Sequence, residues 1–265
     1  NTLNGQNASG NWYFRVADVD ADNRNGTLNS FTISICYKEI QEQPNACGVI
    51  TTTWNGSTWS NGVPLKNVVA IFNGNYSSSA DLEACSVVVN SGANVVFNPG
   101  HTLVVGNEVT VNGTGLLSIE NGAALRQINK AVNTGNVIVK RSSSPMIRLD
   151  YTAWSSPVAS QQLLAFSPNT VTTRFYEYLY TGTTTPTAYQ SVTPTNSFVA
   201  GKGYMIRVDN TWSSSTPSAY NGQFTGVPFN GVVNQSVGTG YNLLGNPYAS
   251  PIDANAFLSD NTSVG

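Results

Sequence analysis

The sequence predicts an all-β fold, and three observations support this prediction. Only 10% of the 265 residues are charged, whereas helical proteins place many Glu, Lys and Arg residues on their exposed faces. The polarity comes instead from Asn, Ser, Thr and Gly, of which Thr favours strands and Asn and Gly favour tight turns. Asn-Gly steps, a strong hairpin signal, separate short apolar runs at Asn25-Gly26, Asn55-Gly56, Asn61-Gly62, Asn73-Gly74, Asn112-Gly113, Asn121-Gly122, Asn221-Gly222 and Asn230-Gly231.

The composition also excludes several classes of function. A net charge of −2 leaves no basic surface for nucleic acid, which requires clustered Lys and Arg. His101 is the single histidine, so a conventional histidine metal cluster is excluded. No run approaches the ~20 apolar residues of a membrane span. We therefore expect a secreted protein, and the polar opening Asn1–Gly5 suggests a piece of a longer one.

The first region, residues 1–37, has two expected strands, Trp12–Val16 and Ser30–Cys36. It resembles the last third of the P-domain (Homo B domain), a jelly roll that follows subtilisin-like catalytic domains. Phe31 departs from the family, which more often has Trp there. The resemblance is carried by Gly10-x-Trp12, Val16-x-Asp18, Gly26-Thr27-Leu28-Asn29-Ser30 and the closing aromatic strand.

Between these strands lies an acidic loop with carboxylates at Asp18, Asp20 and Asp22. Oxygen ligands at this spacing suit Ca²⁺, although the loop lacks the Gly and Glu positions of an EF-hand. Bacterial P-domains often bind calcium, so the resemblance supports a calcium site, the one cofactor we expect. The alternative is a solvated hairpin loop without metal.

The three cysteines, Cys36, Cys47 and Cys85, cannot all pair internally. An extracellular composition favours a disulfide over free thiols. We predict a Cys47–Cys85 disulfide, with Cys36 paired upstream. A Cys36–Cys47 disulfide and free buried thiols are the competing interpretations.

After a charged, proline-containing linker at residues 38–46, a glycine spacing predicts a β-solenoid over residues 47–140. Each unit has an apolar residue, a glycine three residues later and another apolar residue after three more. Phe97 and Ile119 stand 22 residues apart, near the length of one solenoid coil with glycine at its corner. A small meander sandwich is the alternative. The units are Val89-Gly92-Val95, Phe97-Gly100-Leu103 and Ile119-Gly122-Leu125.

Residues 141–265 have longer alternating strands, and we predict a β-sandwich there. The strand Arg174–Tyr180 places Phe175 and Leu179 on one face and tyrosines on the other, and Gly203–Val208 behaves similarly. Helices are expected only at Ala159–Ala165 and Ala254–Leu258, each of one or two turns.

No plausible catalytic cluster is present, so we expect a non-catalytic segment. Glu108 and Glu120 could form a carboxylate pair on adjacent coils of a carbohydrate-active solenoid, but exposed coil residues are the commoner explanation. His101 lies in a turn without a neighbouring nucleophile in the sequence. Four tryptophans are candidates for sugar stacking, although core or edge-covering roles are more usual: Trp54, Trp59, Trp154 and Trp212.

A second resemblance covers nearly everything after the linker. The chain resembles a module of large secreted proteins of Bacteroidetes, especially flavobacteria. The resemblance implies export by the type 9 secretion machinery, a location at the outer-membrane cell surface, and an adhesin, stalk or gliding-associated role with surface glycans or cell-surface proteins as partners. The alternatives are an accessory region of a secreted subtilisin-like protease and a carbohydrate-binding solenoid. Five motifs occur in the same order: TTTWNGSTWSNGVP from Thr51, LEACSVVV from Leu82, YTAWSSPV from Tyr151, GKGY from Gly201 and YNLLGNPY from Tyr241.

Overall fold

The computed structural model describes residues 47, 50–178, 189–238 and 240–262. Its elements are almost entirely strands, so the all-β prediction is confirmed. The expected P-domain segment, residues 1–37, and the linker 38–46 lie outside the described residues. The elements are β1 (Thr51–Trp54), β2 (Val69–Phe72), β3 (Tyr76–Ser77), β4 (Leu82–Ala84), β5 (Ser86–Val89), β6 (Asn94–Phe97), β7 (Thr102–Val105), β8 (Val109–Val111), β9 (Leu116–Ile119), β10 (Ala124–Gln127), β11 (Val137–Ser142), β12 (Tyr151–Trp154), α1 (Leu163–Phe166), β13 (Phe175–Tyr178), β14 (Tyr189–Ser191), β15 (Tyr204–Arg207), β16 (Asn221–Gly226) and α2 (Ala254–Asp260).

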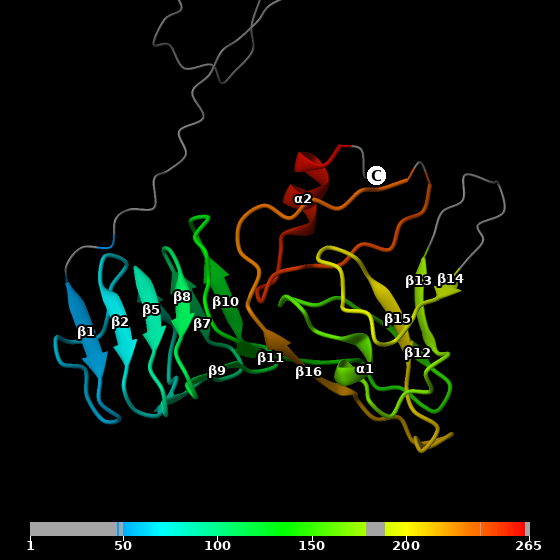
Figure 1. Ribbon diagram of the computed structural model, residues 1–265, viewed down its shortest axis with the longest axis horizontal. Helices are drawn as coiled ribbons and strands as arrows, with labels where there is room; N and C mark the ends of the chain where they lie inside the picture. Colours follow the sequence, from blue (N-terminus) through cyan, green and yellow to red (C-terminus); the bar gives the residue numbers. More distant parts are fainter. Residues whose placement is uncertain (1–46, 48–49, 179–188, 239, 263–265) are drawn as a thin grey trace, which may run out of the picture. The chain divides into compact units, whose positions relative to one another are not determined.

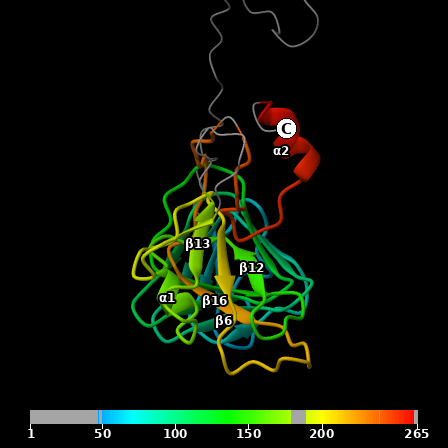
Figure 2. The same cartoon turned by 90° about the vertical axis from the view of Figure 1, so that its right-hand side faces the viewer.

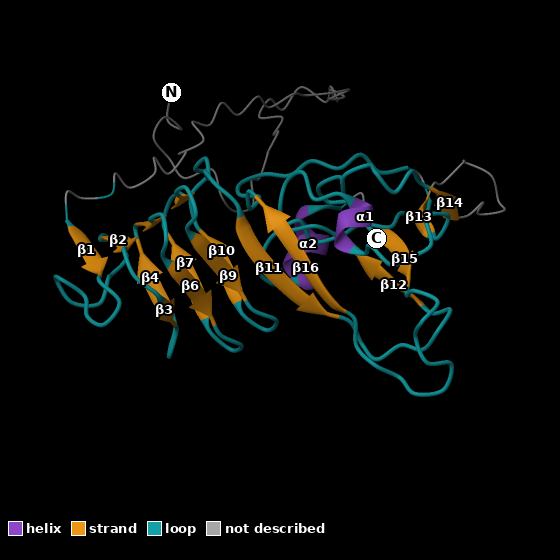
Figure 3. Cartoon of the chain, turned by 60° about the horizontal axis from the view of Figure 1, so that its bottom comes forward, coloured by secondary structure: helices purple, strands orange, loops and turns teal. Residues whose placement is uncertain are grey.

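Strands β1 to β11 form a β-solenoid of about four turns, which confirms the predicted solenoid. The strands lie in three parallel stacks, β1-β2-β5-β8, β3-β6-β9-β11 and β4-β7-β10. From β2 to β10 successive strands pass from one stack to the next, so each complete coil in this range adds one strand to every stack (Figures 1 and 3).

The coil between β6 and β9 has the predicted length of 22 residues, because Phe97 of β6 lies directly opposite Ile119 of β9. Leu103 of β7 lies opposite Leu125 of β10 with the same separation. These side chains point into the solenoid and are 0–3% exposed. Each coil therefore buries its apolar residues against the equivalent residues of its neighbours, which is the main favourable term in stacking.

Glycines turn the corners between the stacks, as the spacing predicted. Gly100 and Gly122 have φ angles of +86° and +82°, in a region that side chains with a Cβ rarely adopt. The two corners stack, and the Gly100 N–H donates to the Gly122 carbonyl over 2.9 Å.

The first strand is covered at its outer edge by the chain that follows it. Thr53 and Ser60 exchange two hydrogen bonds of 2.9 Å, one through the Ser60 side chain. Asn61 Nδ2 donates to the Thr51 carbonyl over 2.7 Å. Because an open strand edge pairs readily with another strand, this turn protects the N-terminal end of the solenoid.

The C-terminal region contains the antiparallel sheet β12-β15-β13-β14, whose strands β12 and β13 run lengthwise in the view of Figure 2. Its inner face packs Trp154 against an aromatic core that includes Phe166 of α1 and Phe224 of β16. The Phe166 and Phe224 rings stack with centroids 4.4 Å apart. The Trp154–Phe224 contact packs this sheet against β16, which itself pairs with β11 of the solenoid. The expected helices are α1, which begins at Leu163, and α2.

Strand β16 joins the two regions, because all six of its residues pair antiparallel with β11. The sequence predicted a turn at Asn221-Gly222, and this was wrong: the step opens β16. A Cβ at Gly222 would lie 2.6 Å from ring atoms of Phe166. The glycine is therefore required for close packing rather than for a turn.

The remaining C-terminal edges of the solenoid are also covered. The Thr134 carbonyl accepts from Val111 N over 2.8 Å, and the Ala249 carbonyl accepts from Leu125 N over 2.9 Å. Among the described residues, the outer edges of β1, β8 and β10 are therefore covered by the protein's own backbone and side chains.

Candidate functional site

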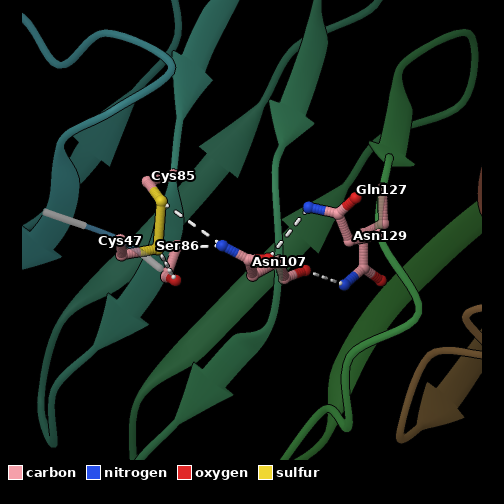
Figure 4. Close-up of a disulfide and its surroundings, with 6 residues drawn as sticks. All are labelled: Cys47, Cys85, Ser86, Asn107, Gln127 and Asn129. Carbon is pink, nitrogen blue, oxygen red and sulfur yellow. Dashed lines mark hydrogen bonds between the residues drawn. A yellow bond between two sulfur atoms is a disulfide. The ribbon is translucent and has the colours of Figure 1, made fainter. Parts of the chain in front are cut away.

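A disulfide joins Cys47 to Cys85, the pairing favoured above over Cys36–Cys47, with a Cα–Cα distance of 5.5 Å (Figure 4). The Ser86 hydroxyl donates a hydrogen bond to Cys47 Sγ over 2.7 Å. Ser86 is the donor because a disulfide sulfur carries no hydrogen. Cys36 lies outside the described residues.

The disulfide occupies one step of a polar ladder at a solenoid corner (Figure 4). Asn107, one coil after Cys85, donates to Cys47 Sγ over 3.0 Å and to Cys85 Sγ over 3.3 Å. Asn129, one coil further, donates to Asn107 Oδ1 over 3.0 Å. The disulfide therefore ends a hydrogen-bonded stack that links three coils.

A second ladder, made only of asparagines, runs along another corner. Asn90 Nδ2 donates to Asn73 Oδ1 over 2.7 Å, and Asn112 Nδ2 donates to Asn90 Oδ1 over 3.0 Å. Asn73 and Asn112 belong to Asn-Gly steps that predicted turns, so these two residues also connect the coils.

The predicted calcium ligands, Asp18, Asp20 and Asp22, lie outside the described residues, and the calcium site stays a prediction. In the part of the chain that the structure describes, no three His, Cys, Asp or Glu side chains gather as a metal site would require. Neither of its helices has the length and apolarity needed to cross a bilayer.

The structure does not bring Glu108 and Glu120 together as a pair on adjacent coils. They belong to the same coil, Glu108 before β8 and Glu120 after β9, and therefore lie at different corners. The Glu120 carboxylate accepts a hydrogen bond from Lys140 Nζ over 2.8 Å. This arrangement offers no shared cleft for two catalytic carboxylates.

His101 has a partner that lies far away in the sequence. Its Nδ1 is 2.8 Å from the Ser78 hydroxyl oxygen, which also accepts from Asn98 N over 2.9 Å. Ser78 is only 3% exposed, so its hydroxyl is not accessible as a nucleophile. The pair fixes the corner between β6 and β7 instead.

The four tryptophans do not form one platform. Trp54 and Trp59 pack with ring centroids 5.5 Å apart and contact Tyr76 at the N-terminal end of the solenoid. Trp154 is a core residue of the C-terminal region, and Trp212 contacts Tyr220 in its loop. The structure thus favours the packing interpretation for Trp54, Trp59 and Trp154.

A cluster of tyrosines and arginines, of which Tyr151 and Arg174 are exposed, lies instead on the outer face of the antiparallel sheet. We call it the tyrosine–arginine face and define it as Tyr151, Arg174, Tyr176 and Arg207. The Tyr151 and Tyr176 rings meet edge to face at 5.8 Å. Arg174 Nη1 donates to the Tyr176 hydroxyl over 3.0 Å, and this bond lowers the Tyr176 pKa below its ordinary value.

Burial raises the pKa of Tyr151 above its ordinary value, and the neighbouring Tyr176 raises it further. Because Tyr151 is opposite Arg207 in the β12–β15 ladder, the arginine lies on the same face of the sheet. The sequence contained part of this signal, since it placed the tyrosines of Arg174–Tyr180 opposite Phe175. It did not reveal that β15 would bring Arg207 beside them.

A groove of 820 Å³ lies between α2 and residues 231–237 and 244–248, with Val232, Val237, Ile252 and Phe257 among its lining residues. No charged side chain except Asp253 and Asp260 lines it. The lining of this groove combines apolar side chains with Asn, Gln and Asp side chains, and we assign no catalytic role to it.

The whole folded unit corresponds to one known family. A family model described as "Domain of unknown function (DUF8693)" matches residues 46–264. The chain belongs to this family. The DUF8693 match spans both the solenoid and the antiparallel region, including Cys47 and α2. No curated protein and no solved structure matches the chain.

Proposed function

We propose that this DUF8693 chain is a non-catalytic segment of a secreted, cell-surface protein with an adhesin, stalk or gliding-associated role. We further propose that it is a Bacteroidetes protein exported by the type 9 secretion system. The observation that carries the proposal is the Cys47–Cys85 disulfide within the coil stack, since structural disulfides persist mainly outside the cytosol.

The rest of the architecture supports a rigid spacer. Coils that bury apolar residues on their neighbours, with polar ladders at their corners, resist bending better than a linker would. The end-covering hydrogen bonds of Thr53, Ser60 and Asn61 keep such a spacer from pairing with other strands. Low charge and a mixed polar surface fit an exposed location.

Protease treatment of intact host cells, followed by peptide mapping under non-reducing conditions, tests this proposal. We expect the chain to be cleaved from intact cells, to contain the Cys47–Cys85 linkage, and to stay inside cells that lack the type 9 outer-membrane channel. A periplasmic protein serves as the control that must remain uncleaved. Recovery of the chain from the cytosol with both thiols free would contradict the proposal, and a subtilisin-like domain on the same polypeptide would favour the protease-accessory alternative.

A further inference from the structure

The tyrosine–arginine face has positive charge without a matching carboxylate. The ion pairs found among the described residues are Lys140–Glu120 and Lys202–Glu177, and neither includes Arg174 or Arg207. Arg174 is exposed and donates to the Tyr176 hydroxyl, a neutral group. The face therefore presents the Arg174 guanidinium to solvent, and neither of its arginines has a carboxylate within ion-pair distance among the described residues.

Arg207 is the more unusual of the two arginines because only 8% of its surface is exposed. Its Nη2 donates to the neutral Asn210 Oδ1 over 2.6 Å. Its Nε is buried and has no hydrogen-bond partner among the described residues. Burying a charged group with unmet donors is unfavourable, so an incoming anion near this guanidinium would be stabilised strongly.

The tyrosines supply the second half of a recognition surface. Tyr151 is 36% exposed and lies edge to face with Tyr176. On the next strand pair, Tyr178 and the half-exposed Tyr189 meet at 5.4 Å. Aromatic rings on a rigid sheet provide apolar area together with hydroxyl groups at low entropic cost, a combination that suits the alternating C–H and O–H groups of a sugar ring.

We propose that the tyrosine–arginine face binds an acidic saccharide, with the tyrosine rings packing on the sugar and Arg174 and Arg207 pairing with its anionic group. The anionic group is a uronic-acid carboxylate or a sulfate ester, both of which accept paired guanidinium hydrogen bonds. This inference rests on the proposed cell-surface function and gives it a ligand class.

Isothermal titration calorimetry on the full chain tests the inference with four probes: oligogalacturonate, a sulfated galactan fragment, a neutral galactan fragment and polyglutamate. We expect binding to at least one of the two acidic saccharides and not to neutral galactan. Preference between the first two probes distinguishes carboxylate from sulfate. Equal binding of neutral galactan, or equal binding of polyglutamate, would overturn the assignment of an acidic saccharide.

Variants locate the binding to this face. Arg174→Gln should weaken binding about tenfold, the loss typical of one charge-assisted hydrogen bond. Arg126→Gln is the matched control, because Arg126 is exposed on β10 of the solenoid and carries the same charge. Tyr176→Ala should also weaken binding, and Arg207→Gln is informative only if its melting curve shows that it folds.

The two proposals fail separately. The saccharide site would be overturned if folded Arg174→Gln and Tyr176→Ala variants bound as the parent does, or if the parent bound neither acidic saccharide. Neither result would affect the cell-surface location, which the protease treatment of intact cells measures separately. A cytosolic location with saccharide binding retained would overturn the proposed function alone.

Discussion

Contacts in the solenoid join residues one coil apart, such as Phe97 and Ile119, whereas contacts in the C-terminal region join distant segments. The hydrogen bond from Thr225 N to Gln161 Oε1, for example, spans 64 residues. Because each coil contacts only its neighbours, the free energy of unfolding of the solenoid is approximately a sum of contributions from the individual coils and their interfaces. A core assembled from distant segments is lost as a unit instead. The two regions should therefore respond differently to equivalent damage.

The largest effect is expected from Phe224→Ala. Phe224 is 1% exposed and contacts Trp154, Phe166 and Phe198, so the change should lower the free energy of unfolding by about 3–5 kcal/mol. Because β16 also pairs with β11, tryptophan fluorescence from both regions should shift to lower denaturant. Single-tryptophan variants that retain Trp59 or Trp154 separate the two signals. Loss confined to the Trp154 signal would show that the solenoid unfolds independently.

Removal of the disulfide tests the solenoid alone. The 38-residue separation between Cys47 and Cys85 predicts a stabilisation of about 4 kcal/mol from loop closure. Cys47→Ser should lower the denaturation midpoint reported by Trp59 more than the midpoint reported by Trp154. The parent chain in a reducing agent should show the same shift, and the variant should show no further one. Coincident shifts of both signals would instead indicate one cooperative unit.

A smaller loss is expected when one asparagine ladder is interrupted. Asn90→Ala removes two hydrogen bonds, one to Asn73 and one from Asn112, and should cost about 1–3 kcal/mol. Asn67→Ala is the control, because Asn67 is exposed in a loop outside the ladders. Hydrogen exchange should increase in the coils adjoining Asn90 and remain unchanged in β12–β15. Faster exchange throughout the chain would contradict the additive view of the coils.

The smallest effect concerns alkaline pH. Burial raises the pKa of Tyr220 above 10, and its hydroxyl donates to the Phe166 carbonyl over 2.7 Å. Since the folded pKa is the higher one, this contribution is present below pH 10 and is lost as the pH rises through the folded pKa. Tyr220→Phe should therefore flatten the decline of the melting temperature above pH 10, as followed by Trp154 fluorescence. An identical decline in parent and variant would assign the alkaline loss to other groups.

The coil period could be predicted from the sequence because a corner constrains the residue type directly. Gly100 and Gly122 are at positive φ, and few other residues tolerate that conformation. The spacing of such glycines along the sequence therefore predicts the length of a coil. The alternation in Arg174–Tyr180 likewise identified Phe175 as an inward residue, because side chains alternate across a strand.

Pairings between distant segments produce no pattern in the sequence comparable to the glycine spacing. Gly222 allows Phe166 to pack against β16, yet in the sequence its Asn-Gly step is indistinguishable from a turn. Likewise, Ser78 and His101 meet only because the β6 coil stacks on the segment before it. The tyrosine–arginine face required the register of β12 with β15, which tertiary contacts select rather than local preference.

Because the contacts that cover β1, β8 and β10 lie at the two ends of the coil stack, the stack can change in length without disturbing them. Duplication of one internal 22-residue unit between β5 and β10 would add another set of three strands, and the covering turn at Ser60 and the closing strand β16 would be unaffected. Each such duplication would extend the stack by about 4.8 Å, the spacing between paired strands. Gene duplication could thus adjust the reach of the protein in uniform increments, while the tyrosine–arginine face keeps its composition.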